Sequence, residues 1–133
     1  MRALFVTPEK KARPIPLDKV SLSRSGFEGD FHAKDKNPRQ ILMVSSSVLD
    51  EFAVPPGALF ENLVIDNLDV MSLDAGRRLH IGEAVLEVTM PCEPCVQMDR
   101  LRKGLKEALN GKRGMFAKVV TTGVIRVGDS VRL

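Results

Sequence analysis

The sequence predicts a mainly β protein, an antiparallel β-barrel with one or two helical insertions. Six to eight short apolar runs are separated by turn residues, which is typical of short strands. Strands and helices do not alternate regularly along the chain, as a βαβ fold would require. The length of 133 residues suits one domain with a real core. We therefore expect residues 1–133 to form a single domain.

The first part of the chain is expected to alternate strands with polar loops. Ala3 to Val6 is a short apolar run closed by Thr7-Pro8. The Lys-, Arg- and Pro-rich stretch that follows, to about Pro16, indicates a surface loop, and Val20 to Leu22 is the next expected strand. Residues 24–39 contain glycines and mixed charges without periodicity. Because loops of this length in compact domains are usually functional or disordered, this segment is a candidate site region.

The middle of the chain predicts a buried strand, a short helix and a hairpin. Gln40 to Val44 has the apolar run of a buried strand, and one of the three serines after it can cap a short helix. Leu63 to Ile65 is the next expected strand. Leu79 to Ile81 and Ala84 to Met90 flank two residues, Gly82-Glu83, which is the spacing of a tight hairpin.

The last part of the chain predicts one longer helix followed by strands. Apolar residues recur at helical spacing at Met98, Leu101, Leu105, Ala108 and Leu109. Gly111 follows where a helix C-cap glycine belongs. The expected strands are Phe116 to Thr121, Val124 to Val127 and Ser130 to Leu133.

The charges are unevenly distributed along the chain. Residues 1–39 carry nine basic and five acidic side chains, residues 40–75 none and six, and residues 76–133 eleven and six. If the two basic flanks meet in the fold, they can form a cationic pocket for a phosphate or carboxylate; a mixed solvated surface is the alternative. The absence of Trp and Tyr disfavours nucleic-acid binding, and no apolar run is long enough to span a membrane.

The only two cysteines, Cys92 and Cys95, form a C-E-P-C segment between an expected strand and the expected helix. A nucleophile, a metal ligand and a redox pair can each use this arrangement. A structural zinc site needs further ligands, and only His32 and His80 are present. The C-x-P-C order is also that of thioredoxin-like proteins, but too little chain follows Cys95 for that fold. A turn with two structural cysteines is the remaining alternative.

Several polar residues are candidates for a site. His32 lies in the long polar segment, whereas His80 alternates with apolar neighbours and is expected to be structural. Arg39 and Gln40 stand at the entry of the buried strand, where the arginine can bind an anion or pair with an acid. Glu61-Asn62 precedes an apolar strand and suits a turn or a binding pair equally.

Seven segments recur in the order found in one known family. They are G-F-E-G-D-F-H at 26–32, R-Q-I at 39–41, P-G-A-L-F-E-N-L-V-I at 56–65, G-R-R-L-H-I-G-E-A-V-L-E-V at 76–88, P-C-E-P-C at 91–95, G-M-F-A-K-V at 114–119 and G-V-I-R-V-G-D-S-V at 123–131. Together they resemble the MOSC domain, named for the C-terminal domain of molybdenum cofactor sulfurases. The resemblance covers nearly the whole chain from about residue 20.

The resemblance implies a β-barrel whose pocket binds the molybdenum cofactor, molybdopterin, which carries a dithiolene and a phosphate. In relatives that reduce amidoximes, one cysteine ligates molybdenum. Cys95 best matches that cysteine and is the implied catalytic residue and metal ligand, and Asn62 aligns with a pocket asparagine. The other residues that the resemblance implies at the site are Asp30, His32, Arg39, Gln40 and Arg113.

The implied function is a molybdenum-cofactor-binding protein, either a reductase of N-hydroxylated compounds or a carrier of cofactor or sulfur. The alternatives are a metal-free sulfur-transfer or thiol-redox protein that uses Cys92 and Cys95, and a noncatalytic binding module. The chain lacks an aminotransferase-like segment, so no pyridoxal-phosphate site is expected in it. A reductase would need a separate electron-donor protein. Without a targeting segment, the expected location is the cytoplasm, with neither nucleic acid nor membrane as partner.

Overall fold

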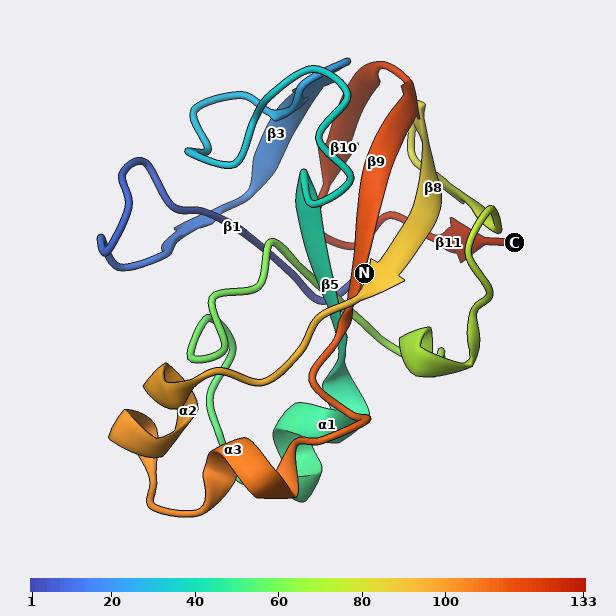
Figure 1. Cartoon of the computed structure of the whole chain (residues 1–133). Helices are drawn as coiled ribbons and strands as arrows, with labels where there is room; N and C mark the ends of the chain where they lie inside the picture. Colours follow the sequence, from blue (N-terminus) through green and yellow to red (C-terminus); the bar gives the residue numbers. More distant parts are fainter.

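A computed structural model describes all 133 residues, which form a curled eight-stranded sheet, a three-stranded sheet and three short helices (Figure 1). The strands are β1 (Ala3–Val6), β2 (Ile15–Leu17), β3 (Lys19–Ser23), β4 (Gly26–Phe27), β5 (Ile41–Ser45), β6 (Leu63–Ile65), β7 (Arg78–Ile81), β8 (Ala84–Pro91), β9 (Met115–Thr121), β10 (Gly123–Arg126) and β11 (Val131–Arg132). The helices are α1 (Ser46–Glu51), α2 (Val96–Leu101) and α3 (Leu105–Ala108), with a 3₁₀ turn at Val70–Ser72. The predicted mainly β, barrel-like class is confirmed, with three helices in place of one or two.

The large sheet has the strand order β11-β7-β8-β9-β5-β6-β1-β2, and the small sheet has the order β10-β3-β4. All neighbours are antiparallel except β5 and β6, which run parallel with Met43 opposite Leu63. A parallel pair needs a crossover connection, and the chain between β5 and β6 provides it through α1. The predicted hairpin between β7 and β8 is confirmed, with Ile81 opposite Ala84.

Both faces of the large sheet are covered, which explains the continuous burial of β5. Successive strand residues point to opposite faces. Ile41 and Met43 therefore belong to a core of 20 buried residues that the large sheet shares with residues of the small sheet. Leu42 and Val44 belong to a second core of 10 buried residues, together with residues from α1 and from the α2–α3 segment. Figure 1 shows the three helices gathered at one end of the sheet.

The single helix expected over Met98–Leu109 is wrong, because the segment forms α2 and α3 instead. Gly104 adopts a φ of +85°, a left-handed conformation that interrupts a helix and that glycine adopts at low cost. The apolar pattern is nevertheless used: Met98 and Leu109 are fully buried, whereas Leu101 is 48% exposed. Two short helices therefore reach the same core that one helix was expected to reach.

The segment before Pro16, expected to be a loop, extends into the edge strand β2. Pro16 lies opposite Phe5 of β1, and β2 is the last strand of the large sheet. A proline has no N–H to give to a neighbouring strand, so an edge is where a sheet accepts it. Ser45 is the residue before α1, but its hydroxyl accepts a hydrogen bond from Val70 N and donates one to Leu68 O instead of capping the helix.

Candidate functional site

One pocket of about 320 Å³ holds a cysteine, a histidine and an arginine on its walls. We call it the thiol pocket. It lies at the border of the second core, between the β1–β2 loop, the turn that follows β4, and the segment that leads into α2. Its lining residues are Thr7, Lys10, Lys11, Ala12, Phe31, His32, Leu42, Phe60, Cys92, Gln97, Arg113 and Phe116. The volume is within the range of small-molecule sites.

Cys92 is the thiol of this pocket. It follows the end of β8, and its backbone N–H donates to Gly114 O over 2.9 Å. The side chain is half-buried against the second core, and burial raises the pKa of the Cys92 thiol, an effect that the nearby Arg113 charge opposes. Cys95 is exposed at the start of α2 and is outside the pocket lining. Both cysteines are free thiols.

Arg113 is the buried cation of the pocket, with only 4% of its surface exposed. Its Nη2 donates a hydrogen bond to Leu59 O, but Nε and Nη1 are buried without any partner. The next residue, Gly114, cannot be replaced without strain, because a Cβ there would lie 2.7 Å from Met43 O. The backbone therefore fixes Arg113 in place. Buried donors normally have partners, so the two unpaired nitrogens of this pocket-lining arginine indicate an anionic ligand.

Glu61 is buried within range of the Arg113 charge. Its carboxylate accepts hydrogen bonds from Gly57 N at 2.9 Å and Leu59 N at 3.2 Å. Burial raises the pKa of Glu61, and those two hydrogen bonds together with the Arg113 charge oppose the rise. Arg113 and Glu61 therefore hold the 57–61 turn from two sides, since Leu59 gives its N–H to Glu61 and its carbonyl to Arg113.

Two lysines add positive charge at the opening. Lys10 and Lys11 line the pocket from the β1–β2 loop, are exposed, and form no ion pair. They belong to the first basic flank of the sequence, and Arg113 belongs to the second. The two basic flanks thus meet at this pocket and make it cationic.

Asp30 and His32 form a hydrogen-bonded pair on the opposite wall. The Asp30 side chain is fully buried, and its Oδ2 lies 3.2 Å from His32 Nδ1. Burial alone would raise the pKa of Asp30, but hydrogen bonds from the His32 side chain and from Thr7 N outweigh it and lower that pKa. Asp30 is therefore an ionised acceptor. The His32 ring remains 36% exposed and lines the pocket.

Asn62 is buried behind this pair. Its Oδ1 accepts from Leu42 N at 2.9 Å, and its Nδ2 donates to Phe5 O at 3.1 Å and to Asp30 Oδ1 at 3.2 Å. The amide therefore joins β5, β1 and Asp30. It supports the pocket wall without lining the pocket.

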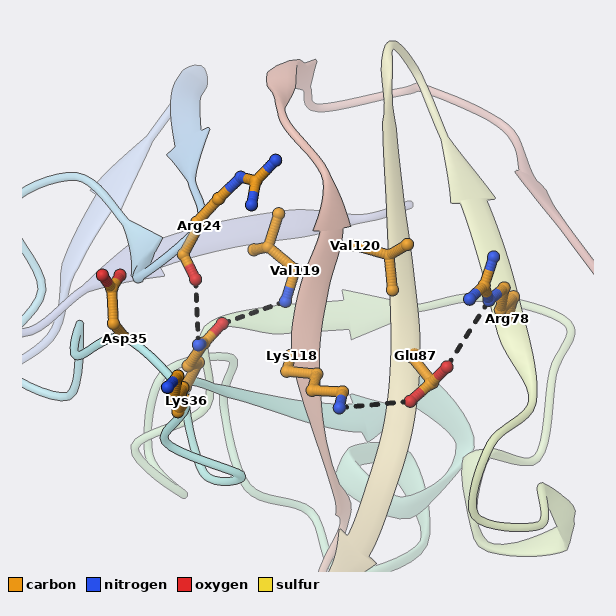
Figure 2. A pocket seen from close by; sticks show the side chains of 9 residues that line it. Arg24, Asp35, Lys36, Arg78, Glu87, Lys118, Val119 and Val120 are labelled. Atoms are coloured by element: carbon orange, nitrogen blue, oxygen red, sulfur yellow. Dashed lines mark hydrogen bonds and ion pairs between the residues drawn. The ribbon is translucent and has the colours of Figure 1, made fainter.

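Gln40 does not line the thiol pocket but a separate polar cleft of about 450 Å³. Figure 2 shows this cleft. This cleft is lined by Arg24, Asp35, Lys36, Gln40, Arg78, Glu87, Lys118, Val119 and Val120. Glu87 lies between Arg78 and Lys118, at 3.4 Å from each. Arg39 is exposed and lines neither cavity.

We expect Gln40→Leu to lower the free energy of unfolding by about 2–4 kcal/mol, since three hydrogen bonds are lost and a buried N–H is orphaned. Gln40 Nε2 donates to Arg24 O and Lys34 O, and its Oε1 accepts from Val119 N at 2.9 Å. Urea denaturation measures the change. Gln97→Leu is the matched control, and equal stabilities of the two variants would contradict the prediction.

The structure thus brings together part of the site set that the sequence suggested. His32 and Arg113 line the thiol pocket, with Asp30 and Asn62 directly behind it. Sequence reasoning did not select the further lining residues Thr7, Lys10, Lys11, Phe31 and Gln97. The sequence signal that could have identified the two lysines is the basic run after β1. That run alone predicted only a surface loop.

No group of three or more His, Cys, Asp or Glu side chains is placed to hold a metal ion. A metal ion without ligands of its own would therefore find too few protein ligands here. A metal that arrives with its own sulfur ligands needs only one protein thiolate, which is a donor suited to a soft metal. None of the helices has the length and apolar character that crossing a membrane requires.

The family model of the MOSC domain matches residues 28–132. The chain belongs to the MOSC domain family. The family is associated with the molybdenum cofactor. The β1–β2 loop, with Lys10 and Lys11, precedes the matched residues, so part of this pocket's positive charge comes from outside them.

Individual proteins are similar to this chain in sequence or in fold. The uncharacterized protein YflK of Bacillus subtilis (strain 168) is 29% identical over 129 residues, covering 86% of this chain and 58% of that protein, so the chain spans little more than half of its relative. The crystal structure of YuaD from Bacillus subtilis matches with a TM-score of 0.84 at 22% identity, over 98% of this chain and 92% of that one. YiiM from Escherichia coli matches with a TM-score of 0.72 at 23% identity, over 100% and 69%. These structures share the fold.

Proposed function

We propose that the thiol pocket binds the molybdenum cofactor and that the protein uses it to reduce N-hydroxylated compounds. The observation that carries the proposal is the orphaned guanidinium of Arg113, buried in a pocket that also holds a thiol. A phosphate group is an anion that an unpaired guanidinium N–H of a buried arginine can bind. Membership of the MOSC family supports a molybdenum-bearing pterin as the carrier of that phosphate.

Different residues of the pocket would bind the phosphate and the molybdenum of such a ligand. Arg113, Lys10 and Lys11 would hold the phosphate. The segment from Cys92 to Gln97 would provide the thiolate for molybdenum, and when bound this group supplies two-electron redox chemistry. The electrons come from a separate donor protein.

Cys95 is our proposed molybdenum ligand, as the resemblance implies. It is exposed, but Cys92 before it and Gln97 after it both line the pocket. Cys92 is the less suitable thiolate, because burial raises its pKa.

The proposal is tested by purifying the wild type, Cys95→Ser and Cys92→Ser from cells that synthesise the cofactor. We expect molybdenum, by elemental analysis, and pterin, by fluorescence, in the wild type, with molybdenum lost from Cys95→Ser and kept by Cys92→Ser. The reverse pattern would move the ligand to Cys92. Wild-type protein that never carries either component would reject the proposed function.

A second candidate function is metal-free sulfur transfer or thiol-redox chemistry. The observation that favours it is the pairing of one exposed cysteine with one pocket cysteine three residues earlier, both free. This function predicts a persulfide on Cys95 after incubation with a persulfide donor, or a reversible Cys92–Cys95 disulfide after oxidation, by mass spectrometry. Neither product would be found if the cysteines serve only the cofactor.

A further inference from the structure

We propose that His32 is the proton-transfer residue of the thiol pocket and that Asp30 is the positioning residue that orients it. The inference rests on the proposed function, since it assigns a step of that reaction. Two observations carry it. The buried Asp30 carboxylate accepts hydrogen bonds on both oxygens. The His32 ring contacts Asp30 through Nδ1, whereas its Nε2 has no partner in the protein.

Asp30 cannot rotate without losing several hydrogen bonds. Its Oδ1 accepts from Thr7 N at 2.8 Å and from Asn62 Nδ2 at 3.2 Å. Its Oδ2 accepts from the backbone N–H of His32 and faces His32 Nδ1, both at 3.2 Å. These donors come from the residue after β1, from the residue before β6 and from the turn after β4, so three parts of the fold hold the carboxylate in one orientation.

An ionised carboxylate only accepts hydrogen bonds, so the His32 proton that faces Asp30 is carried on Nδ1. The Phe31 ring also contacts the imidazole, with 3.7 Å between ring centroids. Nε2 makes no hydrogen bond within the protein, and the ring lines the pocket that contains Cys92 and Arg113. The second nitrogen is therefore left for a pocket ligand. A carboxylate that fixes the tautomer and orientation of a histidine is the usual support of a proton-transfer imidazole.

Reduction of an N-hydroxylated compound consumes protons, and such a residue accelerates their delivery. The balanced reaction is R–NH–OH + 2 e⁻ + 2 H⁺ → R–NH₂ + H₂O. The N–O bond breaks, and the hydroxyl oxygen leaves as water only after it gains a proton. In its protonated form His32 gives the Nε2 proton to this oxygen and is reprotonated from solvent, which also supplies the second proton to the nitrogen. A bound molybdenum cofactor would supply the two electrons, which an external donor protein would replace.

The first test measures the tautomer of neutral His32 by long-range ¹H–¹⁵N correlation at about pH 8.5, where ordinary histidines are neutral. His32 and His80 are the only histidines, and His80 is exposed, so it serves as an internal reference and His80→Gln gives the assignment. We expect the proton of His32 on Nδ1. A His32 tautomer ratio equal to that of His80 would overturn the inference without touching the proposed function.

The second test compares His32→Gln with His80→Gln in protein purified with its cofactor. The substrate is an aromatic amidoxime, and a reduced viologen dye replaces the donor protein. We expect His32→Gln to keep its molybdenum and pterin but to lose about 100-fold or more in turnover, the range of general acid catalysis. Unchanged turnover would overturn the inference, and so would loss of cofactor, which would make His32 a cofactor-binding residue. A wild type without cofactor rejects the proposed function, and the inference with it.

Discussion

Asn62→Asp is expected to destabilise the protein by about 3–5 kcal/mol at pH 8, a large part of the 5–15 kcal/mol that holds a domain of this kind folded. The two side chains have nearly the same shape, so packing is unchanged. The oxygen facing Leu42 N keeps its donor. The other oxygen replaces an NH₂ group that donates to Phe5 O and Asp30 Oδ1, and it brings a second negative charge next to the buried Asp30 carboxylate.

The pH dependence of this variant has a definite sign. Burial and the Asp30 charge both raise the folded-state pKa of a carboxyl at position 62, so the folded state binds a proton that the unfolded chain has lost. The charge-dependent part of the destabilisation is therefore absent below the unfolded pKa of about 4 and complete above the folded pKa. Urea denaturation at pH 5 and pH 8 should show a smaller loss at pH 5.

The matched control is Asn67→Asp. Asn67 is exposed and has a φ of +58°, a conformation that aspartate also tolerates. We expect it to change stability by less than about 0.5 kcal/mol. A loss below about 1 kcal/mol for Asn62→Asp at pH 8, or an equal loss at both pH values, would mean that the Asn62 amide does not face Asp30.

The features that the sequence predicts well are those that depend on local pattern. The buried run of β5 and the Gly82-Glu83 turn each follow from residues adjacent in the chain, and the structure has both. The break between α2 and α3 was missed because the leucine spacing fits one continuous helix. Only the left-handed conformation of Gly104 divides the segment into two helices. The edge strand containing Pro16 was missed because its place depends on β1, 11 residues away.

The site is less predictable for the same physical reason. Lys10, His32, Cys92 and Arg113 come from four separate parts of the chain, and only the sheet order places them around one cavity. The order of the motifs suggested His32 and Arg113, which line the thiol pocket. It suggested Gln40 and Arg39 equally, although Gln40 binds the backbone at the other cleft and Arg39 lines neither cavity. The lining of the two cavities makes that distinction. The orphaned donors of Arg113 have no signature in the sequence at all.

Arg113→Met is expected to weaken binding of the phosphate-bearing ligand strongly. A charge-assisted hydrogen bond is worth about 1.5–3 kcal/mol, so loss of one from Nε or Nη1 reduces affinity by roughly 10- to 100-fold. Arg113→Lys keeps the positive charge but loses the planar guanidinium and its fixed donors. Its affinity should therefore lie between those of the wild type and Arg113→Met. Pterin content after purification from cofactor-producing cells measures the effect, with the exposed Arg77→Met as control.

Stability measurements separate this role from a structural one. Methionine removes two unpaired buried donors, which favours the fold, but it also orphans Leu59 O and leaves the Glu61 carboxylate without its nearby cation. These effects oppose each other, so we expect the ligand-free variant to stay within about 2 kcal/mol of the wild type at pH 5. Because the pKa of Glu61 is already raised and rises further without Arg113, the folded state keeps its proton to higher pH. Stability should then fall more steeply above pH 4.5 in Arg113→Met than in Arg113→Lys. A stable Arg113→Met protein with its full pterin content would place the phosphate elsewhere.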